Sequence, residues 1–239
     1  MTDAAVLARK VILITGASGS FGGALARELA RHGVTVICSG RNVRRLDRLH
    51  AAIEEEGGAC QLYPMDLAGA QPADFEECVD RIVAAHGQLD ALLHCAADFP
   101  GLTPLRHADP GRLAQTIHVN LTARLWLTQA ALPALEAANG CVLMVHDDPA
   151  QVASAYWGGY GLVQTSQLSL VAMLRGELSS GVAIAAFQPA PMPTALRARA
   201  YSHEVTGVRH VDAEAQRCVA ALCGVLTESG RRADCPMTI

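Results

Sequence analysis

The feature that most constrains the fold is a short stretch rich in small residues, TGASGSFGG (15–23), which lies between an apolar run and an amphipathic segment. The apolar run KVILITG (10–16) has the character of a buried strand, and FGGALARELARHG (21–33) has apolar residues at helical spacing. Small residues let the backbone approach a ligand closely, and the following helix aims its N-terminus at an anion. This strand–turn–helix context predicts a nucleotide-binding unit.

The same alternation of strand-like and helical patterns continues along the chain. Further strand-like runs are VTVICSG (34–40), ACQLYPMD (59–66), LDALLHCAA (89–97), GCVLMVHD (140–147), GVAIAAFQP (181–189) and ADCPMTI (233–239). Alternation at this spacing predicts an α/β fold. We expect a single domain over 1–239, a Rossmann-type, doubly wound parallel sheet of about seven strands with helices on both faces. Residues 189–211, with three prolines at the start, are expected to form a substrate loop or lid.

Composition excludes several classes of protein. Hydrophobic residues make up 51% of the chain and the net charge is −4, so we expect no nucleic-acid partner and no membrane association. The N-terminus lacks the pattern of a signal peptide, and we expect a cytoplasmic protein. The eight cysteines form no C-x-x-C pair, so we expect free thiols and no metal site.

The first turn resembles the T-G-x-x-x-G-x-G motif of the short-chain dehydrogenase/reductase family, with Thr15, Gly16 and Gly22 on its fixed positions. The segments GRN, LDALLHCAA, YWGGY and MTI are similar to the YciK-like branch of that family. The resemblance covers about residues 8–194 and the terminal strand. It implies a set of cofactor-binding residues: Gly16, Ser18, Ser20, Phe21, Gly22, Asp66, Leu67, Cys95, Ala96, Pro189 and Thr194.

The end of the second strand indicates which cofactor is bound. A fold that prefers NAD usually carries an acidic residue there for the ribose hydroxyls, whereas this chain has the neutral Gly40 followed by Arg41. A guanidinium can grip a 2′-phosphate through charge-assisted hydrogen bonds. We therefore expect the cofactor to be NADP(H).

The resemblance also implies a catalytic centre, and this chain departs from it. Relatives use a tyrosine for the proton, a lysine four residues later, a serine about 13 residues earlier, and a helix asparagine in a proton relay. Tyr160 and Asn120 match, but Gln164 replaces the lysine and Asp147 replaces the serine. A carboxylate repels developing negative charge, and glutamine carries no positive charge. Because such groups act as a unit, we expect the usual hydride transfer to be weak or lost.

Three readings of the function stay open. The first is an NADP(H)-binding protein with weak or no turnover. The second is an active carbonyl reductase or alcohol dehydrogenase that uses Tyr160 with a non-standard proton relay, acting on a small-molecule carbonyl or alcohol. The third is a non-catalytic subunit or scaffold that pairs with an active relative. For the first two we expect a homodimer or homotetramer, whereas the third predicts pairing with a related subunit. We interpret His94 and His146 as polar side chains that fill the ends of their strands.

Overall fold

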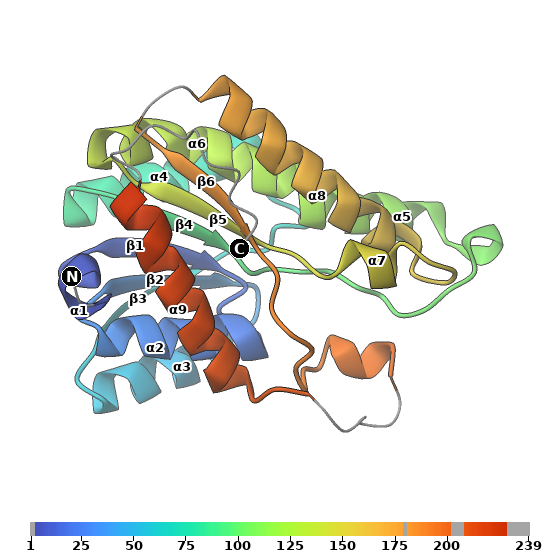
Figure 1. Cartoon of the computed structure of the whole chain (residues 1–239), viewed down its shortest axis with the longest axis horizontal. Helices are drawn as coiled ribbons and strands as arrows, with labels where there is room; N and C mark the ends of the chain where they lie inside the picture. The colour runs from blue at the N-terminus through green and yellow to red at the C-terminus, as the bar shows by residue number, and fades with distance from the viewer. Residues whose placement is uncertain (1–2, 179–180, 202–207, 229–239) are drawn as a thin grey trace.

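A six-stranded parallel sheet in the order β3-β2-β1-β4-β5-β6 forms the centre of the molecule in a computed structural model that describes residues 3–178, 181–201 and 208–228 (Figure 1). The strands are β1 (Val11–Thr15), β2 (Thr35–Gly40), β3 (Ala59–Pro64), β4 (Ala91–His94), β5 (Cys141–Val145) and β6 (Ala183–Phe187). The predicted parallel, doubly wound sheet is confirmed. The seventh predicted strand lies outside the described residues.

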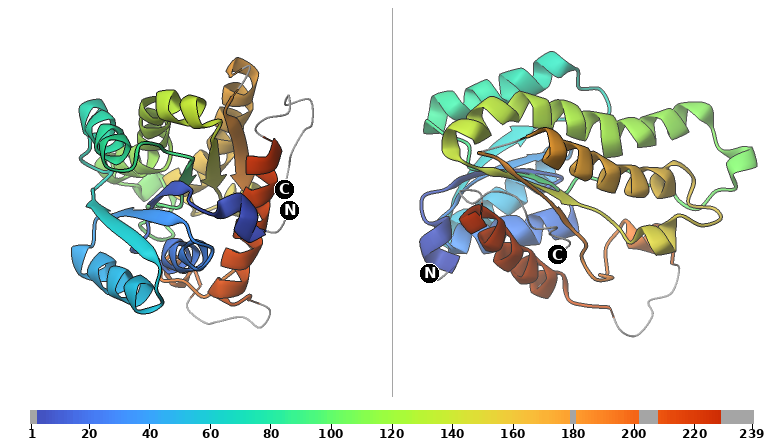
Figure 2. Two further views of the ribbon diagram at one scale, coloured as in Figure 1. Left: turned by 90° about the vertical axis from the view of Figure 1, so that its left-hand side faces the viewer. Right: turned by 45° about the horizontal axis from the view of Figure 1, so that its top comes forward.

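Helices cover both faces of this sheet (Figure 2). One face packs against α2 (Ser20–Arg31), α3 (Val43–Glu55) and α9 (Val211–Glu228), and the other against α4 (Pro72–His86), α6 (Ala123–Ala138) and α8 (Gly158–Glu177). The remaining helices are α1 (Asp3–Leu7), α5 (Pro110–Ile117), α7 (Pro149–Val152), the 3₁₀ turns η1 (Leu105–His107) and η3 (Arg197–Arg199), and the π-helical turn η2 (His118–Thr122).

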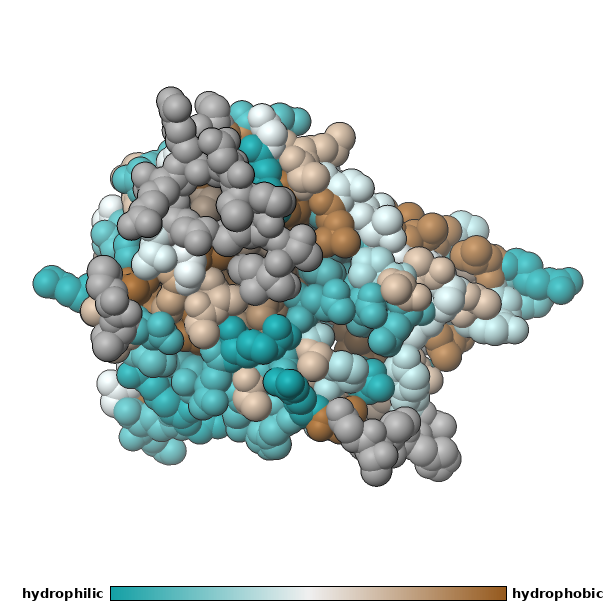
Figure 3. Space-filling view, in the orientation of Figure 1, coloured by the Kyte–Doolittle hydropathy of each residue, from teal (hydrophilic) through white to brown (hydrophobic). Residues whose placement is uncertain are grey.

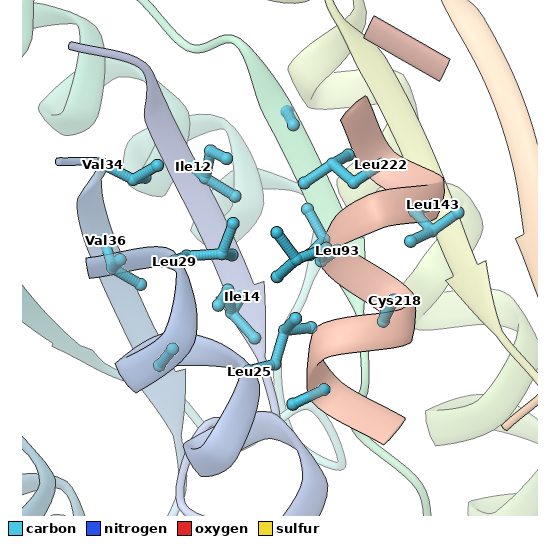
Figure 4. Close-up of a cluster of buried hydrophobic side chains, with 14 of the residues drawn as sticks. Ile12, Ile14, Leu25, Leu29, Val34, Val36, Leu93, Leu143, Cys218 and Leu222 are labelled. Carbon is cyan, nitrogen blue, oxygen red and sulfur yellow. The ribbon is translucent and has the colours of Figure 1, made fainter. Parts of the chain in front are cut away.

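Apolar strands buried on both faces explain the continuous hydrophobic runs of the sequence. All five residues of β1 are buried. Ile12 and Ile14 face the α2 and α9 side, where Figure 4 shows them beside Leu25 and Leu222. Leu13 lies in the cluster on the opposite face. This two-sided burial is typical of a parallel sheet whose crossover helices lie on both faces.

The strand order places a crevice beside β1. This strand pairs with β2 on one side and with β4 on the other, so the chain reverses its winding direction there. Ligands of open α/β sheets bind outside the carboxyl ends of the strands at such a switch point. The turn after β1 therefore opens onto the place where a ligand is expected.

The surface combines a hydrophilic side with exposed apolar residues. The space-filling view shows mostly hydrophilic residues over α2 and α3, and apolar residues gathered along α8 (Figure 3). Leu162 and Met173 of α8 are exposed. Within the described residues, no helix combines the length and the apolar character needed to cross a bilayer.

Candidate functional site

A cavity of about 780 Å³ lies at the carboxyl ends of the strands, and it brings together residues from the whole length of the chain. Every cofactor-binding residue predicted from the sequence lines it: Gly16, Ser18, Ser20, Phe21, Gly22, Arg41, Asp66, Leu67, Cys95, Ala96, Pro189 and Thr194. Tyr160, Asp147 and Gln164 line it as well, whereas Asn120 does not. The structure therefore places all but one of the predicted site residues around a single space.

The turn after β1 is built for close approach of a ligand to the backbone. Gly16 has a φ of +71°, and a Cβ there would lie 2.6 Å from the Cα of Ala96. A Cβ on Gly22 would lie 2.5 Å from the carbonyl oxygen of Gly16. Gly19 precedes the first residue of α2, and no side chain caps that helix. The first N–H groups of α2 are therefore left for an anion, because a helix N-terminus attracts negative charge.

Ser20 takes the place of a glycine in the family motif without crowding the turn. It is exposed, begins α2 and lines the cavity. The two glycines whose replacement would force a clash, Gly16 and Gly22, are both retained. The substitution at Ser20 therefore leaves the cradle intact.

The end of β2 lies close to the side chain of Ser18. A Cβ on Gly40 would lie 2.7 Å from the Oγ of Ser18, so no larger residue fits without moving that side chain. Arg41 is exposed on the cavity wall, and Asn42 caps α3 by accepting a hydrogen bond of 3.0 Å from the backbone N–H of Arg45. This end of the cavity therefore presents guanidinium groups and no carboxylate at the end of β2.

The opposite end of the cavity contains a phenol bonded to a carboxylate. Tyr160, on α8, is only 4% exposed, and its hydroxyl donates to Oδ2 of Asp147 at 3.1 Å. Burial raises the pKa of Tyr160, and the negative charge of Asp147 and the hydrogen bond to it raise that pKa further. The phenol is therefore held neutral, with its proton directed at Asp147.

Gln164 lies one turn after Tyr160 and contacts the same loop. Its Oε1 accepts from the backbone N–H of Asp147 at 2.9 Å, and the side chain is 2% exposed. Oδ1 of Asp147 accepts from the backbone N–H of Asp148 at 2.8 Å. Residues 147, 160 and 164 thus meet as the spacing predicts, but as a network that fixes the Asp147 loop.

Asn120 shapes the helix in which it lies. It lies in the π-helical turn η2, where its Nδ2 donates to the carbonyl oxygens of Thr116, at 2.7 Å, and of Asp98, at 2.8 Å. Its Oδ1 accepts from the N–H of Asp98 at 3.0 Å. Its own carbonyl oxygen accepts from Nε2 of Gln167 at 2.8 Å. This turn interrupts the regular α-helix, and both the side chain and the carbonyl oxygen of Asn120 are hydrogen-bonded within the protein.

Arg124 is a site residue that the sequence reasoning missed. It comes from α6, lines the cavity and is 2% exposed. Its guanidinium donates to the carbonyl oxygens of Ala96, at 2.6 Å, and of Val145, at 2.8 Å, and to Oε1 of Gln167 at 3.2 Å. Burial lowers the pKa of Arg124 to about 10, so it stays charged near neutrality. The signal was a lone charge inside the apolar stretch NLTARLWLTQAAL, one turn after Asn120.

The two histidines near the strand ends behave as packed polar groups. His94 is fully buried, one ring nitrogen lies 3.0 Å from Oγ1 of Thr128, and burial lowers the pKa of its imidazole well below its usual value. Nδ1 of His146 lies 2.8 Å from the carbonyl oxygen of Asp147. No group of three or more His, Cys, Asp or Glu in the described part of the chain could hold a metal ion.

A hydrogen bond to the buried Glu214 holds the start of the predicted lid region. Oε2 of the buried Glu214 accepts from the N–H of Ala190 at 2.9 Å and from the guanidinium of Arg217 at 2.8 Å. Farther along, the backbone N–H of Arg197 donates to Oγ1 of Thr194 at 3.1 Å. Residues 202–207 of this region lie outside the described part. The described residues 189–201 border the cavity as a loop with one 3₁₀ turn.

Comparison of the sequence with known proteins gives a consistent set of matches. A family model described as short chain dehydrogenase matches residues 10–205. The uncharacterized oxidoreductase YciK of Escherichia coli strain K12 is 29% identical over 197 residues, which cover 82% of this chain and 78% of that protein. Dehydrogenase/reductase SDR family member 4 of Sus scrofa is 31% identical over 174 residues, which cover 72% of this chain and 62% of that protein.

Solved structures resemble the whole fold. The structure of the oxidoreductase YciK from E. coli has a TM-score of 0.86 and 26% identity, and covers 96% of this chain and 94% of that chain. A short-chain dehydrogenase from E. coli CFT073, complexed with NADPH, has a TM-score of 0.87 and 26% identity, and covers 96% of this chain and 95% of that chain.

Proposed function

Because the chain belongs to the short-chain dehydrogenase family, we propose that it binds NADP(H) and that its hydride transfer to or from a carbonyl or alcohol carbon is weak or lost. The nucleotide half of the cavity supports binding, and the reacting half supports impaired chemistry. Different residues form the two halves of the cavity, so cofactor binding and hydride transfer can be tested separately.

Binding is supported by the fit of the cavity wall to a phosphorylated dinucleotide. The glycine turn and the uncapped start of α2 suit a pyrophosphate. Arg41 suits a 2′-phosphate, because guanidinium and phosphate form charge-assisted hydrogen bonds. Any residue larger than glycine at position 40, including the acidic residue that prefers NAD, would have to displace the Oγ of Ser18. A family relative of similar fold is complexed with NADPH, which agrees with this choice.

Weak turnover is supported by the direction of the Tyr160 proton. NADPH, when bound, supplies the hydride, and the protein must deliver a proton to the substrate oxygen. The Tyr160 hydroxyl donates to Asp147 instead, and Asp147 holds a negative charge where a donor to the substrate oxygen is needed. Gln164 offers an amide to the loop and no positive charge. Loss of general acid catalysis alone lowers rates by about 10²- to 10⁴-fold.

The single observation that carries this proposal is the hydrogen bond from Tyr160 to Asp147. We would titrate the unaltered protein with NADPH by fluorescence and then follow nicotinamide oxidation with a panel of aldehydes and ketones. Saturable binding with turnover far below about 1 s⁻¹, the low end of ordinary enzymes, is the expected result. Turnover at ordinary enzyme rates would refute the impaired centre and favour the alternative of an active reductase with a non-standard relay through Tyr160.

A pair of variants sharpens the test. Asp147→Ser combined with Gln164→Lys restores the residue types of the family, and we expect turnover to rise by about 100-fold or more. The matched control is Asp148→Ser with Gln164→Lys. Asp148 caps α7 by accepting from the N–H of Ala150, a bond that serine can also make, so the control removes a neighbouring carboxylate without restoring the serine at 147. Equal turnover of the two double variants would refute the role given to Asp147.

A further inference from the structure

The guanidinium of Arg124 is a buried positive charge with no acidic partner in the described part of the chain. Its three hydrogen bonds go to two backbone carbonyls and one amide oxygen, all of them neutral acceptors. Its Nε is buried and has no hydrogen-bond partner among the residues that the structure describes. Burying a charge costs several kcal/mol unless it is compensated.

The place of this charge is the reacting half of the cavity. The guanidinium donates to the carbonyl oxygens of Ala96, just after β4, and Val145, at the end of β5. Both residues line the cavity. Its charge acts on Tyr160, where it favours the ionised phenol against the larger opposing effects of burial and Asp147. The relatives hold their cation on α8, at the position of Gln164, whereas this chain holds one on α6.

We infer that Arg124 supplies a buried, fixed positive charge to the reacting half of the cavity and that this charge shifts the preference of the site toward the reduced cofactor. This inference rests on the proposed binding of NADP(H) with its nicotinamide beside Tyr160. The oxidised nicotinamide ring is a cation and the reduced ring is neutral. A fixed positive charge in a poorly solvated site therefore weakens NADP⁺ relative to NADPH, whereas a nearby negative charge does the opposite.

The other charged groups at this end set the background. Asp147 and Asp148 contribute negative charge, and Arg197 on the same cavity wall contributes positive charge. Two further lining residues are paired, Asp98 with Arg112 and Arg217 with Glu214. His146, whose pKa burial lowers, contributes no charge near neutrality. Arg124 therefore determines how the ratio of the NADP⁺ and NADPH dissociation constants changes when this residue is altered, and not the absolute value of that ratio. The change in this ratio also distinguishes an electrostatic role of Arg124 from a structural one. Loss of its hydrogen bonds to the carbonyl oxygens of Ala96 and Val145 would weaken the binding of both cofactor forms alike.

The test measures dissociation constants of NADP⁺ and NADPH for the full chain, by calorimetry and fluorescence, and compares their ratio among variants. Arg124→Gln keeps hydrogen-bonding capacity and removes the charge, and we expect the ratio of the NADP⁺ constant to the NADPH constant to fall by about tenfold. This magnitude corresponds to a unit charge acting across the site at an effective dielectric constant of about 20. Arg124→Lys keeps the charge, and its ratio should stay within about twofold of the unaltered protein's.

Two further variants keep the inference falsifiable if Arg124→Gln fails to fold. Gln167→Glu places a carboxylate at the atom that Nη1 of Arg124 already contacts, so it neutralises the charge without removing the guanidinium, and the ratio should fall. Asp147→Asn removes the opposing charge, and the ratio should rise. The matched control is Arg41→Gln, at the other end of the cavity, which should weaken both forms equally.

The outcomes separate this inference from the proposed function. If neither form of the cofactor binds, the proposed function itself is wrong. If both bind and the ratio is unchanged in Arg124→Gln and Gln167→Glu, the cofactor assignment stands and the role of Arg124 is refuted.

Discussion

Replacing Arg41 by alanine should abolish the preference of the protein for NADPH over NADH. Arg41 lies on the cavity wall directly after Gly40, where a Cβ would meet the Oγ of Ser18 at 2.7 Å. The preference for a 2′-phosphate therefore has two sources, a guanidinium that attracts it and the absence of an acidic residue at position 40, where any side chain would have to displace the Oγ of Ser18. A hydrogen bond to a charged group contributes about 1.5–3 kcal/mol.

That free energy sets the expected magnitude. Loss of the Arg41 contact should raise the dissociation constant of NADPH by about 10- to 150-fold, since each 1.4 kcal/mol is a factor of ten. The constant for NADH, which lacks the phosphate, should change by less than about twofold, as expected for a surface substitution. Both constants can be measured by nicotinamide fluorescence.

The close contact between position 40 and Ser18 can be tested with variants of its own. Gly40→Asp alone should weaken both cofactors, because its side chain collides with Ser18. Gly40→Asp with Ser18→Gly removes that collision and should favour NADH. The reasoning is refuted if the unaltered protein binds NADH and NADPH equally, or if Arg41→Ala weakens both to the same extent.

Two predictions concern buried polar groups. Burial raises the pKa of Glu214, but the hydrogen bonds from Arg217 and from the N–H of Ala190 outweigh it and lower that pKa overall. The carboxylate therefore contributes stability above its unfolded pKa, and this is lost as the pH falls through its folded pKa. Thermal unfolding of Glu214→Gln should show a loss of about 1 kcal/mol near neutrality and a flatter decline in acid; an unchanged acid profile would contradict this. Asn120→Ala removes three side-chain hydrogen bonds and should cost about 2–3 kcal/mol in urea unfolding, while its NADPH affinity stays within about twofold, because the residue lies outside the cavity. A large loss of affinity in the folded variant would contradict that placement.

The sequence predicted the nucleotide half of the site more completely than the reacting half. Turn residues such as Gly16 and Gly22 have their geometry dictated by local backbone constraints, so a motif locates them directly. The spacing of Tyr160 and Gln164 on one helix also predicted that they share a face. These parts depend on contacts between residues close in sequence or on a fixed sheet topology.

The position of Arg124 in the site and the hydrogen bond from Tyr160 to Asp147 could not be predicted, because they depend on contacts between residues in different elements. The hydrogen bonds of Arg124 join α6 to the ends of β4 and β5 and to Gln167 on α8, which are 21 to 43 residues away. No short motif contains such a set. The family motif places its cation four residues after the tyrosine, so it does not point to a position one turn after Asn120. The terminal strand predicted at 233–239 lies outside the described residues.

The π-helical turn at His118–Thr122 sets the rotational phase of everything that follows it in α6. Adding or removing one residue in a helix turns the later side chains by about 100° around its axis. Leu127, Ala131 and Leu135 reach the core, and Arg124 reaches the cavity, only at the present phase. Within that turn, the Nδ2 of Asn120 donates to the carbonyl oxygens of Asp98 and Thr116. Any change that converts this turn into regular α-helix would therefore rotate Arg124 away from the cavity and Leu127 away from the core together.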